Sequence, residues 1–194
     1  MTEHKLPDLL APNLRVVFVG TAAGAYSAKL GAYYAKPGNR FWLALHEAGI
    51  TPRLFEPQEY PKLFELCVGL TNLCKRDAGM DHVVKPTRDD LLQFEVKLHQ
   101  YRPRIVAFTG KRPASYWLKT PTRRLRYGRQ DRAASDFPDV FVLPSPSGAA
   151  RSYWNLRRGR RWLTGFDVAR ELRELARPRS TPPHRPIPAM MNCC

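Results

Sequence analysis

A loop of five small residues follows the first apolar stretch of the chain and is well suited to contact a ligand. Gly20 and Gly24 bracket Thr21, Ala22 and Ala23. Side chains of this size let a bound group approach the backbone amides closely. The segment therefore predicts a ligand loop that acts through its main chain.

Two adjacent aromatic residues and a polar turn come next. Tyr33 and Tyr34 precede the sequence PGNR at positions 37–40, which is typical of a turn, and a helical pattern starts at Phe41. A small-residue loop, an aromatic pair and a polar turn supply the floor and walls of a site for a flat, polar group. This is the shape of a nucleobase pocket, although the same pattern would suit many α/β ligand sites.

A second loop, residues 74–86, carries two carboxylates in a chain that is otherwise strongly basic. Asp77 and Asp81 lie on either side of Gly79. One interpretation is structural, with each carboxylate capping the loop or pairing with Lys75 or Arg76 on the surface.

Four short apolar runs alternate with helical patterns and predict the fold class. The runs are residues 16–19, 67–73, 104–108 and 140–143, and the helical patterns are residues 41–49, 87–101 and 111–118. This alternation predicts an α/β protein, a three-layer α/β/α sandwich with a mostly parallel central sheet. Ligands bind beyond the carboxyl ends of such strands, where loops 20–24, 74–82, 109–112 and 144–151 should converge.

The composition favours a polyanionic partner. The 194 residues contain 32 Lys and Arg against 17 Asp and Glu, a formal charge of +15. A field of this size favours nucleic acid over a membrane surface, because no basic amphipathic helix dominates. Lys111 and Arg112 are candidate DNA-backbone contacts, although either could be an ordinary surface charge.

The remaining features set the domain and compartment expectations. We expect one domain over residues 1–177 and a disordered, Pro- and Arg-rich tail over residues 178–194. The four cysteines have no spacing typical of a zinc or iron–sulfur site, so we expect no metal and no cofactor. Without an apolar span or a secretory signal, we expect a cytoplasmic protein that makes no membrane contact and acts as a monomer.

Four segments in this order resemble the mismatch-specific uracil/thymine DNA glycosylase family, part of the uracil-DNA glycosylase superfamily. They are GTAAG after the first strand, then YYAKPGNRFW, GLTNLCKR and LPSPSGAAR. The resemblance runs from about Leu9 to Arg177. It implies the superfamily's fold and hydrolysis of the N-glycosidic bond of a damaged or mispaired pyrimidine flipped out of DNA.

The resemblance also exposes a departure from the family at the catalytic position. Family members commonly place an Asn where Ala22 stands, and that Asn holds the attacking water. As the glycosidic bond breaks, the sugar becomes oxocarbenium-like, so a nearby carboxylate can stabilise it. Asp81 is our candidate for this role, with Asp77 as the alternative.

The base pocket implied by the resemblance comprises Gly20, Thr21, Ala22, Ala23, Gly24, Tyr34 and Asn39. In it Tyr34 stacks on the flipped base, and Thr21 and Ala23 present backbone amides. Each aromatic or polar residue also has a structural interpretation, Tyr34 as core and Asn39 as a turn former.

The DNA-binding segment implied by the resemblance comprises Ser145, Pro146, Ser147, Gly148, Ala149, Ala150 and Arg151. Ser145 to Gly148 should face a phosphate beside the flipped nucleotide. Ala149 occupies the place of a bulkier wedge, which leaves Arg151 to fill the gap in the duplex. Without the resemblance, the PSPSG sequence is equally well interpreted as a rigid loop.

Together these features predict a monofunctional DNA repair glycosylase acting on DNA that contains uracil or another damaged or mispaired base. In this hypothesis an Asp carboxylate replaces the missing Asn. The alternative is an inactive nucleic-acid-binding module that keeps the glycosylase fold.

Overall fold

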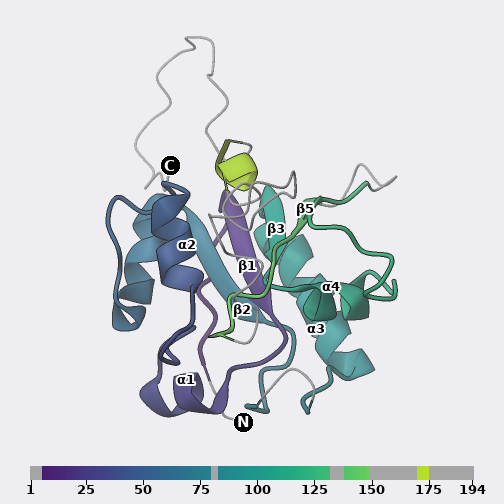
Figure 1. The fold of residues 1–194 in the computed structure, drawn as a ribbon. Helices are drawn as coiled ribbons and strands as arrows, with labels where there is room; N and C mark the ends of the chain where they lie inside the picture. Colours follow the sequence, from purple (N-terminus) through teal and green to yellow (C-terminus); the bar gives the residue numbers. More distant parts are fainter. Residues whose placement is uncertain (1–5, 80–82, 132–137, 149–169, 175–194) are drawn as a thin grey trace.

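Four parallel strands and a short antiparallel edge strand form the central sheet (Figure 1). The computed structural model describes residues 6–79, 83–131, 138–148 and 170–174. The parallel strands are β1 (Val16–Gly20), β2 (Val68–Asn72), β3 (Ile105–Phe108) and β5 (Asp139–Val142). The order is β2-β1-β3-β5-β4, and β4 (Gly128–Arg129) pairs antiparallel with β5. The predicted parallel strands are confirmed, whereas β4 is too short and too polar for a sequence signal.

The sheet is covered on both faces, as predicted. Successive side chains of a strand point to opposite faces. Val16 and Phe18 belong to one apolar cluster with residues of α2 (Phe41–Glu47). Val17 and Val19 belong to a second cluster with residues of α3 (Arg88–Tyr101) and α4 (Lys111–Trp117). Figure 1 shows α2 on one side of the sheet and α3 and α4 on the other.

Local chemistry explains where the predicted helices begin. Thr87 accepts a hydrogen bond from the Asp90 backbone N–H, and the Asp90 carboxylate accepts one from the Thr87 N–H, which caps α3. The connection after α2 forms the 3₁₀ helix η1 (Pro57–Leu66), where Pro61 lacks the N–H that a regular α-helix needs.

Helix α1 (Ala25–Leu30) was not predicted. It has only six residues and buries only Ser27, so the apolar spacing that signals a helix is missing. Glycines mark its ends: Gly24 is its N-cap, and Gly31 ends it in the left-handed conformation with φ 69°. In the described part of the chain, no helix is long and apolar enough to cross a membrane.

Candidate functional site

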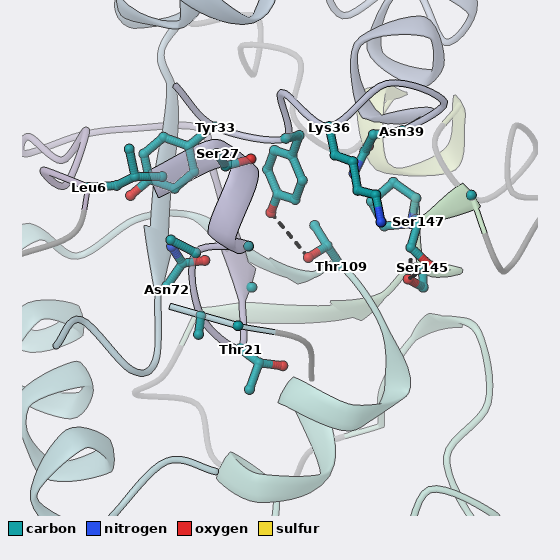
Figure 2. A pocket seen from close by; sticks show the side chains of 18 of the residues that line it. Leu6, Thr21, Ser27, Tyr33, Lys36, Asn39, Asn72, Thr109, Ser145 and Ser147 are labelled. Carbon is teal, nitrogen blue, oxygen red and sulfur yellow. Dashed lines mark hydrogen bonds between the residues drawn. The ribbon is translucent and has the colours of Figure 1, made fainter. Parts of the chain in front are cut away.

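A cavity of about 460 Å³ opens at the carboxyl ends of the parallel strands (Figure 2). Its walls come from segments far apart in the sequence. The first loop supplies Gly20 to Gly24, the α1–α2 region supplies Ser27, Tyr33, Tyr34, Lys36, Pro37 and Asn39, and other segments supply Leu6, Asn72, Gly79, Thr109 and Ser145 to Gly148. The structure thus brings all seven residues of the predicted base pocket to one cavity, together with Ser145 to Gly148 of the predicted DNA-binding segment.

Gly20 makes room for two side chains on the floor of the cavity. A Cβ atom at this position would lie 2.5 Å from Asn72 Oδ1 and 3.5 Å from the Tyr34 hydroxyl. Gly20 and Asn72 are also register partners at the ends of β1 and β2. The parallel pairing therefore places the Asn72 carboxamide beside the first loop.

One polar side chain of the cavity wall, that of Asn72, lacks a hydrogen-bond partner in the described part of the chain. Asn72 is 4% exposed, and its carboxamide makes no hydrogen bond to any described residue. The Thr21 hydroxyl also has no partner among the described residues, but it is sealed from solvent and its side chain points away from Tyr34 (Figure 2), so it is not offered to a ligand. Because the Asn72 carboxamide faces the cavity without a described protein partner, it is available to a polar ligand.

Asn72 is the main residue that the sequence interpretation missed. It ends a predicted strand inside the GLTN segment, and an Asn at a strand end carries no local signal of function. A ligand needs both a donor and an acceptor to satisfy this carboxamide. A flat base with an N–H beside a carbonyl fits that requirement.

Tyr34 is held rigidly at the cavity. Its ring stacks on Phe41, with centroids 3.8 Å apart and an interplanar angle of 21°. Its hydroxyl lies 3.1 Å from Thr109 Oγ1, which donates to the Val19 carbonyl at 3.2 Å (Figure 2, dashed line). The backbone of Tyr34 is left-handed, with φ 54°, a conformation that costs energy and recurs at functional sites.

Tyr33, rather than Tyr34, is the tyrosine of the pair that is buried in the core. It is 2% exposed and donates from its hydroxyl to the Pro7 carbonyl at 3.0 Å. Burial raises the pKa of Tyr33 far above its ordinary value, so the hydroxyl stays protonated. The neighbouring Tyr34 is half-buried.

The polar turn and the second motif contact each other across the mouth of the cavity. Arg40 N–H donates to the Pro146 carbonyl at 2.8 Å. Asn39 accepts from Phe41 N–H through Oδ1 at 2.9 Å, so this side chain satisfies the first backbone N–H of α2 as well as lining the cavity. Ser145 and Ser147 join through their hydroxyls at 3.2 Å. The PSPSG segment is therefore an ordered loop with its serines toward the cavity.

The loop after β2 runs along the first loop. Cys74 N–H donates to the Thr21 carbonyl at 2.8 Å, and Gly79 N–H donates to the Ala23 carbonyl at 2.8 Å. Gly79 lines the cavity, whereas Asp77 is exposed and is not among the residues of its wall. Burial raises the pKa of the Cys74 thiol, which donates to Asp77 Oδ2 at 3.6 Å.

Several predicted residues lie away from the cavity wall or beyond what the structure describes. Asp81, Ala149, Ala150 and Arg151 lie outside the described residues. Lys111 begins α4, just after the cavity residue Thr109, and its ammonium lies 4.6 Å from the centre of the Tyr127 ring. Arg112 beside it is exposed. Neither residue belongs to the described wall of the cavity.

The chemistry of the described wall is that of a binding site for a neutral polar group. It presents two carboxamides, several hydroxyls, one lysine and the main chain of a small-residue loop, but no Asp, Glu or His among the described residues. Within the described ranges, no three His, Cys, Asp or Glu side chains gather closely enough to hold a metal ion.

Comparison with known proteins identifies a family and a related fold. The family model of the uracil DNA glycosylase superfamily matches residues 7–164, a range that contains every described residue of the cavity except Leu6. The fold is similar to a solution NMR structure from Methanosarcina acetivorans, provisionally described as a uracil DNA glycosylase. That comparison has a TM-score of 0.57 and 20% sequence identity over 89% of this chain and 97% of the other.

Proposed function

Because the chain belongs to the uracil DNA glycosylase superfamily, we propose that it hydrolyses the N-glycosidic bond of uracil flipped out of DNA. Superfamily membership supports a DNA glycosylase in general, and the cavity supports the choice of base. The observation that carries this choice is the buried, unpartnered carboxamide of Asn72. Its N–H₂ group can donate to O4 of uracil while its carbonyl accepts from N3–H.

The other walls suit the remaining parts of a flipped nucleotide. The Tyr34 ring lines the cavity and is supported by stacking on Phe41, so it is placed to contact the base. The main chain of the first loop can donate to the negative charge that develops on the leaving base. Ser145, Ser147 and Lys36 lie at the side of the cavity away from Asn72 (Figure 2), where the sugar and phosphate would lie.

The proposed reaction needs a group that stabilises the oxocarbenium-like sugar and orients the attacking water. Ala22 cannot do either, and we assign the role to Asp81. Asp81 follows Gly79, a residue of the cavity wall, by two positions in the sequence. Asp77 is equally close in sequence, but its exposed carboxylate is engaged by Cys74.

We also propose that the enzyme is monofunctional and accepts mispaired or otherwise damaged bases besides uracil. Hydrolysis by water leaves an abasic site, so strand scission should require added alkali. The small side chains of the first loop leave space for a base larger than uracil, and base flipping is easiest at a mismatch.

An inactive binding module is the second candidate function. The observation in its favour is that the described wall of the cavity holds no carboxylate and that Ala22 replaces the usual Asn. Such a protein would bind a flipped base and release nothing.

Replacing Asn72 tests the assignment of the base-reading residue. We expect Asn72→Ala to lower single-turnover excision of uracil by about 10²-fold or more, since it removes both base contacts. Asn39→Ala is the matched comparison, because it removes the same group from the same cavity. The Asn39 carboxamide already accepts a hydrogen bond from Phe41 N–H. We therefore expect Asn39→Ala mainly to lower the free energy of unfolding, by about 1 kcal/mol. Equal losses of excision in the two variants would refute the role of Asn72.

A further inference from the structure

A buried cluster of charges lies directly behind one wall of the cavity. Asp8 pairs with Lys75 at 2.7 Å and with Lys97 at 2.7 Å, and it accepts from the Thr71 hydroxyl at 2.6 Å. The Lys75 side chain is only 8% exposed. Burial alone would raise the pKa of Asp8, but the two ammonium groups hold it below its ordinary value.

Lys75 differs from Lys97 in what else it contacts. Its ammonium donates to the Leu6 carbonyl at 2.6 Å and lies 3.4 Å from the Tyr33 hydroxyl. Leu6 and Tyr33 both line the cavity, and Figure 2 shows them on the same side of it as Asn72. Lys97 contacts Asp8 from α3 and forms no hydrogen bond or ion pair with a described residue of the cavity wall.

Lys75 therefore ties three separate segments together at one point. Tyr33 in turn donates to the Pro7 carbonyl, and Leu9 exchanges two backbone hydrogen bonds with Leu70 at 2.9 and 3.0 Å. These bonds fasten residues 6–9 along β2. Lys75 follows Asn72 by three residues. Residues 72–75 therefore supply the Asn72 carboxamide to the cavity and also fasten the apolar residues Leu6 and Tyr33.

We infer that Lys75 is the positioning residue that sets Leu6 and Tyr33 against the flipped base. This inference rests on the proposed function. In uracil the atom next to the C4 carbonyl is C5, so a base whose O4 meets Asn72 directs C5 toward a neighbouring part of the wall. Leu6 and Tyr33 are apolar residues of the wall on this side of the cavity (Figure 2). Lys75 thereby controls which substituents at C5 are accepted.

The test compares Lys75→Met with Lys97→Met, two variants that each remove one ammonium from Asp8. Single-turnover excision is measured on uracil, 5-fluorouracil and thymine, each placed opposite guanine in the same oligonucleotide. In Lys75→Met the preference for uracil over the 5-substituted bases should fall by about tenfold, the scale of discrimination that one methyl group provides. In Lys97→Met the preference should stay within about twofold of the wild-type value, although unfolding in urea is easier.

A purely structural role for Lys75 predicts a different pattern. In that case both variants would lose stability while their base preference stayed at the wild-type value, or both would lose base preference to the same extent. Either result overturns the inference. If Lys75→Met does not fold, Asp8→Asn/Lys75→Met removes the buried Asp8–Lys75 pair together, which is often tolerated, and leaves Lys97 partly exposed to solvent. The double variant should show the same loss of preference.

Hydrogen exchange separates failure of this inference from failure of the proposed function. If the wild-type protein releases no uracil, the proposed function fails. The Leu9 amide should nevertheless exchange faster in Lys75→Met than in Lys97→Met, because only Lys75 holds Leu6 and Tyr33. Equal exchange of the Leu9 amide in the two variants contradicts the positioning role of Lys75, whether or not the protein releases uracil.

Discussion

Gly20→Ala should remove most activity with little effect on folding. The added Cβ would lie 2.5 Å from Asn72 Oδ1, whereas ordinary contacts begin near 3.4 Å, so the carboxamide must move by about 0.9 Å. A misplacement of this size at a reacting centre costs about 10²-fold in rate, or about 2.7 kcal/mol of barrier. The unpartnered carboxamide breaks no protein hydrogen bond when it moves, so the free energy of unfolding should change by no more than about 1 kcal/mol.

Single-turnover excision of uracil and urea unfolding measure the two sides of this prediction. Gly24→Ala is the matched control, because it makes the same change in the same loop and its Cβ would have no atom within 4 Å. We expect it to lose far less activity than Gly20→Ala. Equal activity in the two variants, or a large loss of stability in Gly20→Ala, would refute the placement of Asn72 over Gly20.

Three further predictions concern stability, pH and DNA affinity. Thr87→Ala removes the cap of α3 and should lower the free energy of unfolding by about 1 kcal/mol in urea titrations without changing excision; no loss would contradict the capping role. The pKa of Asp8 is lowered from 3.8 in the folded protein, so its contribution to stability is present above that pH and is lost as the pH falls further. Urea unfolding at pH 7 and pH 3 should therefore show a smaller pH dependence in Asp8→Asn than in the wild type, and an equal dependence would contradict the pairing. Lys111→Ala should weaken binding to DNA of any sequence and reduce the slope of log affinity against log salt by about 1, measured by fluorescence anisotropy; an unchanged slope would exclude a phosphate contact.

The fold was predictable because its signals are local. Each parallel strand is a short apolar run, and α3 begins with a capping pair that can be read from four consecutive residues. Helix α1 gives no such signal, since it is one and a half turns long and mostly exposed. Strand β4 exists only through its pairing with β5.

The site was predictable only where a contiguous segment forms it. The first loop and the PGNR turn were singled out because each is a short run of suitable residues. Asn72 was missed because its position over Gly20 depends on the parallel register of β1 and β2. The sequence interpretation offered Lys75 and Arg76 as surface partners of Asp77, but they pair with Asp8 and Asp90. The first of these contacts spans 67 residues, a separation that no local pattern reveals.

Release of uracil from a defined oligonucleotide tests the central claim most directly. Wild type, Asp81→Asn and Asp77→Asn are each incubated with single-stranded uracil DNA and with U:A and U:G duplexes, and then treated with alkali. We predict alkali-dependent scission by the wild type and by Asp77→Asn, and its loss in Asp81→Asn. Loss only in Asp77→Asn would move the catalytic role to that carboxylate. Absence of scission by the wild type on every substrate, with DNA binding intact, would contradict the glycosylase and favour the inactive binding module.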